Sequence, residues 1–204
     1  MITPLLAALI VLGCSSQPEP PRRPPDHLVF GLETWRPPFA YWDSATSAPV
    51  GFDIELATLL CRSCRWSCDI VPVPAESLAV ALKRGEIDVA MRVAEGETVY
   101  AQDLVLSHPY YLTGLGSNVQ VVDSATKAAV ERTAGRRIVD TVLSPEYYCL
   151  AMRSSDTHRL ARLNDALAAL MGGYVYERLH VKWFGYPPLN VAAPDSVTAS
   201  WNRP

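Results

Sequence analysis

Two short stretches carry the side chains best suited to holding a small polar solute, and each directly follows an apolar run. They are Glu33, Trp35 and Arg36 after Leu28–Leu32, and Arg92 and Glu95 after Ile87–Met91. A guanidinium group can form two parallel hydrogen bonds with a carboxylate, and an indole ring offers a flat wall on which a ligand can stack. We therefore predict a ligand-binding site here, with no catalytic residue, metal or cofactor.

Both arginines also have an ordinary structural explanation. Arg36 lies in a loop, where long charged side chains are mostly exposed to solvent. Arg92 follows a buried strand directly, and a charge in such a place needs a partner, for which Asp88 and Glu95 are close in sequence. Phe39, in the same loop as Arg36, is expected to lie in the core.

The cysteines beyond the N-terminal segment could bind a metal or form disulfides. They are Cys61, Cys64, Cys68 and Cys149, and the first three follow the spacing C-x2-C-x3-C. With His108 or Cys149 this spacing could complete a metal site. The apolar run Leu5–Leu12 near the N-terminus is typical of an export signal, and an exported chain meets an oxidising compartment. We therefore predict at least one disulfide among the four instead, with the pairing left open.

The elements that must position these residues alternate between strands and helices. The predicted elements are strands at Leu28–Leu32, Asp69–Val73 and Ile87–Met91, a helix from Phe52 with Asp53 as its N-cap, and a helix opened by Pro74–Ser77 and ended by Gly85. This alternation predicts an α/β fold with a mostly parallel sheet covered by helices. Ligands of such sheets collect at the carboxyl ends of the strands, where the candidate site residues lie.

The end of the chain is predicted as two helices and a tail. A stripe of leucines after Asp156 predicts a helix, Gly172-Gly173 ends it, and Tyr174–Trp183 forms the next. Residues 186–204 show little periodicity and are expected to be a loose extension. The net charge of −3 comes without a basic cluster, so nucleic acid is not expected as a partner.

The N-terminus is predicted to be a processing and tethering segment. Leu5–Leu12 is an apolar run too short to span a bilayer, and it leads into Val11–Cys14, which resembles the lipobox of bacterial lipoproteins. The resemblance implies a signal segment over residues 1–14, with Cys14 as the lipid-bearing residue, and a proline-rich tether over 15–26. The protein is then exported and lipid-anchored to the cell membrane or outer membrane, facing the periplasm. An ordinary signal peptide with an incidental cysteine is the alternative.

Motifs placed in order along the chain resemble those of the extracellular solute-binding proteins, family 3. They are Val50–Ala57 (VGFDIELA), Ala79–Asp88 (AVALKRGEID), Ser107–Tyr111 (SHPYY) and Tyr176–Gly185 (YERLHVKWFG). Members of this family are the receptors of ABC importers for polar amino acids. The resemblance implies a periplasmic-binding-protein type II-like fold, in which the ligand lies between two lobes and closure presents it to a permease.

The resemblance also implies how the chain is divided. Lobe one comes from residues 27–113 and 148–185, and a reduced lobe two comes from 114–147, with hinge strands near Leu112–Gly116 and Glu146–Met152. Lobe two is far shorter than is usual in the family, with room for one strand–helix–strand unit. So short a lobe buries little apolar surface by itself and is expected to close poorly over a ligand.

The loop that holds the ligand in the family departs from the family pattern here. In an ungapped alignment, the carboxylate-binding arginine falls on Tyr100, and neighbouring contact positions fall on Val93 and Glu95. A glutamate at such a position repels a carboxylate. Arg92 or Arg36 could restore the positive charge, so we predict a site with an altered ligand.

These observations leave hypotheses from three classes of function. The first is a solute-binding lipoprotein that serves an ABC permease and takes a small polar solute. The second is a non-transport accessory that binds another periplasmic protein. The third is an enzyme similar to the periplasmic cyclohexadienyl dehydratases, with Glu33 or Glu95 as its acid. We expect no enzyme, because a short lobe cannot exclude water from the cleft.

Overall fold

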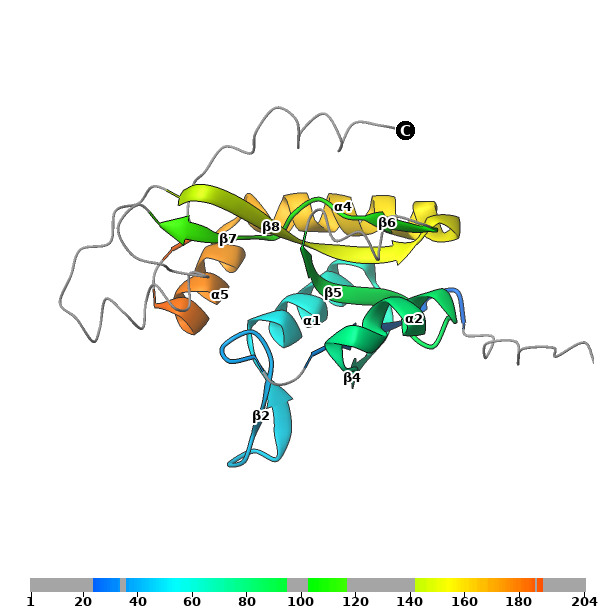
Figure 1. Ribbon diagram of the computed structural model, residues 1–204, viewed down its shortest axis with the longest axis horizontal. Coiled ribbons are helices and arrows are strands. Elements are labelled where there is room, and N and C mark those ends of the chain that lie inside the picture. Colours follow the sequence, from blue (N-terminus) through cyan, green and yellow to red (C-terminus); the bar gives the residue numbers. More distant parts are fainter. Residues whose placement is uncertain (1–23, 34–35, 95–102, 117–141, 186, 189–204) are drawn as a thin grey trace, which may run out of the picture.

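The computed structural model of the protein describes residues 24–33, 36–94, 103–116, 142–185 and 187–188. In these residues a six-stranded sheet carries helices on both faces, and a two-stranded hairpin projects from it (Figure 1). The strands are β1 (His27–Leu32), β2 (Tyr41–Asp43), β3 (Ala48–Val50), β4 (Ser67–Pro72), β5 (Val89–Ala94), β6 (Leu104–Leu106), β7 (Tyr111–Gly116) and β8 (Val142–Arg153). The helices are α1 (Phe52–Cys64), α2 (Leu78–Lys83), α4 (Thr157–Met171) and α5 (Tyr174–Phe184), with 3-10 turns η1 (Ala75–Ser77) and η3 (Ser154–Asp156).

One half of the sheet is parallel. The strands follow the order β4-β1-β5-β8-β6, and β7 pairs with β8 beside this path. β1 pairs in parallel with β4 along its whole length and with β5 on its other side. β8 runs antiparallel to β5, β6 and β7. Parallel strands joined through helices confirm the predicted α/β fold class.

Two cores lie on opposite faces of the sheet, because successive side chains of a strand alternate in direction. In β1, Leu28, Phe30 and Leu32 pack into the larger core with α1, α4 and α5. Val29 packs into the smaller core with α2. The central strands are therefore held from both sides, which fixes the position of their carboxyl ends.

The first turn of α1 is capped by a loop and not by a side chain. The backbone N–H groups of Phe52 and Asp53 donate to the carbonyl groups of Pro38 and Phe39 at 3.0 and 2.9 Å. The prediction that Asp53 is the N-cap is therefore wrong, since Gly51 takes that position and the Asp53 side chain lies in the core. The loop carbonyls already accept from the N–H groups that a capping side chain would serve.

Two strand boundaries differ from the prediction in ways that affect the site. β4 begins at Ser67 and not at Asp69, and β5 spans Val89–Ala94 and does not end at Met91. Arg92 thus lies within a strand and not after it. Buried side chains continue on both sides of Arg92 to the end of β5, and the charged residue conceals this continuation in the sequence.

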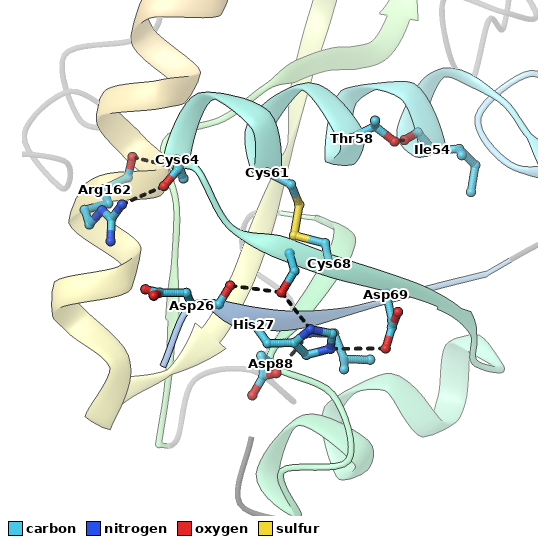
Figure 2. Close-up of a disulfide and its surroundings, with 12 residues drawn as sticks. Asp26, His27, Ile54, Thr58, Cys61, Cys64, Cys68, Asp69, Asp88 and Arg162 are labelled. Carbon is cyan, nitrogen blue, oxygen red and sulfur yellow. Dashed lines mark hydrogen bonds and ion pairs between the residues drawn. A yellow bond between two sulfur atoms is a disulfide. The ribbon is translucent and has the colours of Figure 1, made fainter. Parts of the chain in front are cut away.

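A disulfide joins the end of α1 to the start of β4. Cys61 and Cys68 are bonded, with their Cα atoms 6.3 Å apart (Figure 2). This confirms the prediction of at least one disulfide, while Cys64 and Cys149 are buried and outside any disulfide. Burial raises the pKa of the Cys64 thiol, which therefore stays protonated at neutral pH. Within the described ranges, no group of His, Cys, Asp or Glu side chains is arranged to hold a metal ion.

A polar cluster fastens the start of the domain to β4. The His27 ring lies between two side chains of that strand, with Nδ1 3.0 Å from Ser67 Oγ and Nε2 3.1 Å from Asp69 Oδ2 (Figure 2). The backbone N–H of Ser67 also donates to the Asp26 carbonyl at 2.9 Å. Because β1 and β4 both begin here, these contacts hold the two parallel strands in register.

The C-terminal helices and the strands beside residues 117–141 follow the prediction. α4 and α5 are separated by Gly172 and Gly173. The two segments predicted as hinges are strands, β7 and β8, which pair antiparallel, while their role as hinges remains a prediction. Residues 1–23, 117–141 and 189–204 lie outside the described part, so the signal segment, the tether, the division into lobes and the tail remain predictions. None of the helices that the structure describes has the length and apolar character of a membrane span.

Candidate functional site

The structure brings three of the predicted site residues together near the carboxyl ends of two neighbouring parallel strands. Glu33 follows β1, Arg36 belongs to the loop after β1, and Arg92 lies in β5. Arg92 Nη2 is 2.5 Å from Glu33 Oε2, and Arg36 Nε is 3.3 Å from the same oxygen. Two guanidinium groups therefore share one carboxylate oxygen. We call these three residues the arginine–glutamate cluster.

Arg92 is positioned by an irregularity in β5. The pairing with β8 shifts register between Ala90 and Val93, and Arg92 between them has a φ of 56°. This left-handed conformation costs a residue other than glycine about 1–2 kcal/mol. Backbone outliers of this kind cluster at functional sites, and bulges re-aim side chains beside them. The bulge is thus a reason, independent of charge, to regard Arg92 as a functional residue.

The two ion pairs of Glu33 lie in different environments. The Arg92 side chain is 11% exposed and its guanidinium carbon is 5.6 Å from the centre of the Phe39 ring, whereas the Arg36 side chain is 63% exposed. Water screens an exposed pair, which contributes little to stability. A mostly buried guanidinium depends on its partner, because loss of the partner leaves an uncompensated charge. Glu33 is therefore first of all the partner of Arg92.

Glu33, the partner that the structure shows for Arg92, was not predicted, and of the two predicted partners the structure tests only Asp88. Asp88 pairs with Arg153 at 2.8 Å and not with Arg92. The other predicted partner, Glu95, lies outside the described residues. The prediction considered only neighbours in sequence, whereas Arg92 reaches across to the end of the adjacent parallel strand.

The structure describes only some of the other residues for which the sequence made a prediction. Phe39 is in the core as predicted, with 2% of its surface exposed. The residues that fall outside the described part of the chain, and so remain predictions, are Trp35, Glu95, Tyr100 and the lipidation site Cys14. The arginine–glutamate cluster offers charge-assisted hydrogen bonds of both signs, which suits the binding of a polar solute.

A buried acid interacts with Arg92 from within the core. Asp53 is 1% exposed and accepts a hydrogen bond from the Tyr110 hydroxyl at 3.1 Å. The Tyr176 hydroxyl donates in turn to the Tyr110 carbonyl. Burial raises the pKa of Asp53 from 3.8 to about 6, although the charge of Arg92 and the hydrogen bond from Tyr110 both lower it. Among the described residues, two carboxylates thus influence Arg92, and of these Glu33 is the one that reaches solvent.

Replacing Asp53 with asparagine is expected to change how stability depends on pH. Between the usual pKa of 3.8 and the folded-state pKa of about 6, the folded protein takes up a proton that the unfolded chain does not. The free energy of unfolding therefore rises as the pH falls from about 6 to about 4, by about 3 kcal/mol from this group. The Asp53→Asn variant loses this rise, which urea denaturation between about pH 4 and pH 8 measures.

The matched control for this experiment is Asp165→Asn. Asp165 is exposed on α4, so the same change of charge is made without touching the core. Its pH profile of stability should follow that of the wild type. An Asp53→Asn variant that keeps the wild-type rise on acidification would contradict the burial of this acid.

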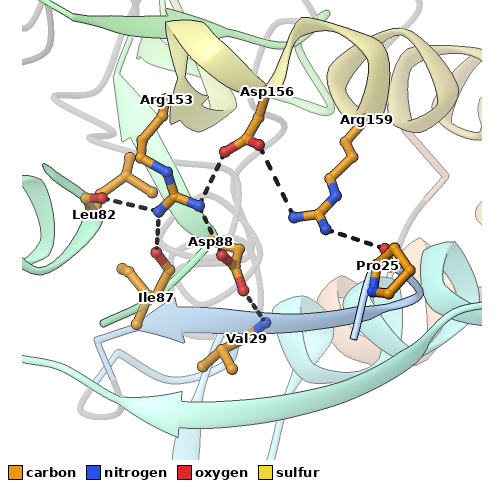
Figure 3. A network of polar contacts seen from close by, with 8 residues as sticks. All are labelled: Pro25, Val29, Leu82, Ile87, Asp88, Arg153, Asp156 and Arg159. Atoms are coloured by element: carbon orange, nitrogen blue, oxygen red, sulfur yellow. Dashed lines mark hydrogen bonds and ion pairs between the residues drawn. The ribbon is translucent and has the colours of Figure 1, made fainter. Parts of the chain in front are cut away.

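A second polar network lies at the other end of β5. Figure 3 shows Arg153 of β8 at its centre. Arg153 Nη1 donates to the carbonyl groups of Leu82 and Ile87 at 3.1 and 2.8 Å. Arg153 Nη2 pairs with Asp88 at 2.8 Å and with Asp156 at 2.9 Å. This network ties β8 to the corner between α2 and β5, and we assign it a structural role.

Sequence reasoning missed both buried networks. The burial of Asp53 could have been inferred from the apolar residues around it in Phe52–Ala57. These residues place a charged side chain on the buried face of the helix. Tyr110 and Tyr176 lie in two of the quoted motifs, but no pattern connects them to α1. Asp156 lies three residues after Arg153, but the partners that make Arg153 the centre of the network, Asp88 and the Leu82 and Ile87 carbonyl groups, lie far from it in sequence.

The whole described domain matches a known family. The model of the bacterial extracellular solute-binding proteins, family 3, matches residues 28–186. This range includes β1 from Leu28 onward, the arginine–glutamate cluster and α5. Comparison with curated proteins gives no match.

Solved structures show the same fold. A mutant of the arginine-binding protein of T. maritima has a TM-score of 0.63 and 23% identity, over 78% of this chain and 96% of that one. A binding component of an ABC transporter from Wolinella succinogenes, complexed with lysine, has a TM-score of 0.64 and 17% identity over 78% and 96%. A Salmonella typhimurium periplasmic binding protein with high arginine specificity has a TM-score of 0.59 and 18% identity, over 78% and 99%.

Proposed function

Because the chain belongs to the bacterial extracellular solute-binding proteins, family 3, we propose that it is a lipid-anchored receptor that binds a small polar solute at the arginine–glutamate cluster and delivers it to an ABC permease. The family accounts for the class of function and for a place outside the cytoplasmic membrane. The lipid anchor at Cys14, the permease and the altered ligand site belong to the proposal.

One observation carries the site assignment. Arg92 and Glu33 meet near the carboxyl ends of two neighbouring parallel strands, 2.5 Å apart. Open α/β sheets bind their ligands at such strand ends. The position of the cluster and the bulge that presents Arg92 therefore support the same site.

A suitable solute is expected to raise the melting temperature of the purified protein, and Arg92→Gln should abolish the effect. At a concentration of one hundred times Kd, a ligand adds about 2.7 kcal/mol of stability. For a domain of this size, that corresponds to about 5–10 °C. The measurement is a thermal-shift screen of amino acids, small organic acids and amines, with wild type and variant compared at the same ligand concentrations.

The matched control is Arg84→Gln. Arg84 is 62% exposed and lies after α2, away from the cluster, so the same charge is removed elsewhere. This variant should keep the full ligand-induced shift. If no solute shifts the wild type while a stable protein partner co-purifies with it, the transport function is refuted.

That second outcome defines the alternative function, a non-transport accessory that binds a periplasmic protein. One observation favours it: the mostly buried cation at the site, Arg92, already has an internal carboxylate as its partner. A site that satisfies its own charge has less need of a solute. Identification of a co-purifying protein, with loss of the complex on mutation of exposed Arg36, tests this alternative.

An enzyme has weaker support. Glu33 is the one described residue among the two acids considered from sequence, and its carboxylate is engaged by two arginines. A carboxylate held in this way is suited to binding. We therefore keep solute binding as the function.

A further inference from the structure

We infer that the proline-rich segment Pro18–Arg23 docks back on the domain that follows it, along the open edge of β4, with a proline ring in an apolar pocket beside Trp42. The inference goes beyond the proposed function. It is carried by the described residues around the pocket and by the sequence of the segment, and it does not require that a solute binds at the arginine–glutamate cluster.

The pocket lies between the β2–β3 hairpin and the end of the sheet. It encloses about 90 Å³. Its walls are the apolar and aromatic side chains of Leu32, Trp42, Pro49, Ile54, Ile70 and Pro72. The Trp42 side chain is 56% exposed, so the pocket reaches the surface. An apolar cavity of about 150 Å³ binds benzene. The smaller ring of a proline therefore suits this pocket.

An exposed tryptophan flanked by prolines is the kind of surface that binds proline-rich segments. Such segments favour the polyproline II conformation and dock in grooves lined by aromatic side chains. The entropic cost is small, because the ring of each proline already fixes φ. This chain carries such a segment of its own, since Pro18, Pro20 and Pro21 lie among the six residues of Pro18–Arg23.

A turn at the start of the described chain directs the preceding residues back along the sheet. The His27 N–H donates to the Pro24 carbonyl at 3.0 Å, which closes a four-residue turn before β1. The Ser67 N–H donates to the Asp26 carbonyl at 2.9 Å, so the turn is fixed beside the first residue of β4. A chain that reverses its direction here continues alongside β4.

The segment has the length that this path needs. β4 is paired with β1 on one side, and no described strand lies on its other side. Its six residues cover about 20 Å, and the six residues of Pro18–Arg23 in the polyproline II conformation cover about 19 Å. β4 ends at Pro72, which lines the pocket. The prolines of the segment therefore reach the pocket when its arginines lie near the start of β4.

Charge complementarity supports the same path. Asp69 lies in the first half of β4 and pairs with the His27 ring, but 66% of its side chain remains exposed (Figure 2). Arg22 and Arg23 are the residues of the segment next to this part of the strand. A guanidinium group can add charge-assisted hydrogen bonds to a carboxylate that solvent still reaches. Exposed ion pairs contribute little, so contact with Trp42 supplies most of the docking.

Docking has a consequence for the distance between the domain and the membrane. In the proposed function Cys14 carries the lipid anchor, so residues 15–17 would be the free chain between the lipid and the docked segment. The domain is then held close to the membrane surface. The docked segment also covers an edge strand, whose open backbone groups otherwise invite pairing with another chain.

The test follows trypsin cleavage of the bond between Arg22 and Arg23 in the purified protein, with the fragments identified by mass spectrometry. Trypsin does not cut the next bond, because Pro24 follows Arg23, so a single bond reports on the segment. Docking should protect this bond. Trp42→Ala should raise its rate of cleavage about tenfold, and Asp69→Asn about twofold.

The matched control is Tyr174→Ala. Tyr174 is 70% exposed on α5, so an exposed aromatic side chain is removed outside the pocket, and the rate of cleavage should stay that of the wild type. Equal rates for the wild type and Trp42→Ala overturn the inference. Protection that is lost when the protein is diluted also overturns it, because the segment then docks on a second copy of the chain.

A second measurement does not use cleavage. In a ¹H–¹⁵N spectrum the indole N–H of Trp42 is assigned by its loss in Trp42→Phe. A variant with Pro18→Ser, Pro20→Ser and Pro21→Ser should shift this resonance and leave that of buried Trp66 in place. An unchanged Trp42 resonance overturns the inference. Neither measurement includes a solute, so failure of the inference leaves the proposed function and its thermal-shift test unaffected.

Discussion

Replacing Arg153 with glutamine is expected to lower the free energy of unfolding by about 3–5 kcal/mol, enough to lower the melting temperature by about 10 °C. Arg153 pairs with Asp88, whose side chain is only 6% exposed, and donates to two backbone carbonyl groups as well. Asp88 accepts a hydrogen bond from the Val29 N–H at 3.0 Å, so its charge is held inside the fold (Figure 3). Loss of the guanidinium leaves that charge without its cation.

The matched control is Arg159→Gln, in the same network. Arg159 lies 3.9 Å from Asp156 and donates to the Pro25 carbonyl at 3.1 Å, but it has no contact with Asp88 (Figure 3). We expect it to cost less than about 1 kcal/mol. Urea denaturation of both variants measures the difference. Equal losses would show that the buried pair of Arg153 and Asp88 has no special weight.

Replacing Gly51 with alanine is expected to cost about 3 kcal/mol or more. Gly51 has a φ of 144° and a ψ of 173°, a region open in practice to glycine alone. A Cβ atom at this position would lie 2.1 Å from the carbonyl oxygen of Phe39, which is backbone and cannot turn aside. That carbonyl accepts from Asp53, so relief of the clash would disrupt the loop cap of α1.

Gly172→Ala supplies the control for this substitution. Gly172 has a φ of −74°, and its nearest contact for a Cβ atom is 3.3 Å, at the Ala168 carbonyl. The change is expected to alter stability by less than about 1 kcal/mol. Thermal denaturation of the two variants, followed by circular dichroism, makes the comparison. A Gly51→Ala variant as stable as Gly172→Ala would contradict the close approach of loop and helix.

Much of the fold could be predicted because short patterns of apolar, polar and glycine residues determine its strands and helices. The apolar run of β1, the leucine stripe of α4 and the Gly172-Gly173 break each determine an element over a few residues. The end of a strand was predicted wrongly where one charged residue interrupted an apolar run. Arg92 interrupts the apolar run of β5, so the strand appeared to end at Met91.

The candidate site could be predicted in part for the same reason. Polar residues after apolar runs pointed to Glu33, Arg36 and Arg92, since parallel strands bring their carboxyl ends together. The pairing of Arg92 could not be predicted, because it depends on a bulge and on a register between strands that no local pattern encodes. Asp53 was assigned to a helix cap because its type suits one, while the Pro38 and Phe39 carbonyl groups that make a cap unnecessary come from a separate loop.

The place at which the chain enters the sheet has a mechanical consequence. β1 is the first strand of the described residues, lies between β4 and β5, and runs in the same direction as both. A pull on the N-terminus loads β1 along its own axis, so the hydrogen bonds to both neighbours are sheared together instead of being opened one after another. Force that reaches the domain through its N-terminus is therefore resisted by the hydrogen bonds of both pairings at once. The arginine–glutamate cluster lies at the opposite end of β1 from the point where the force is applied.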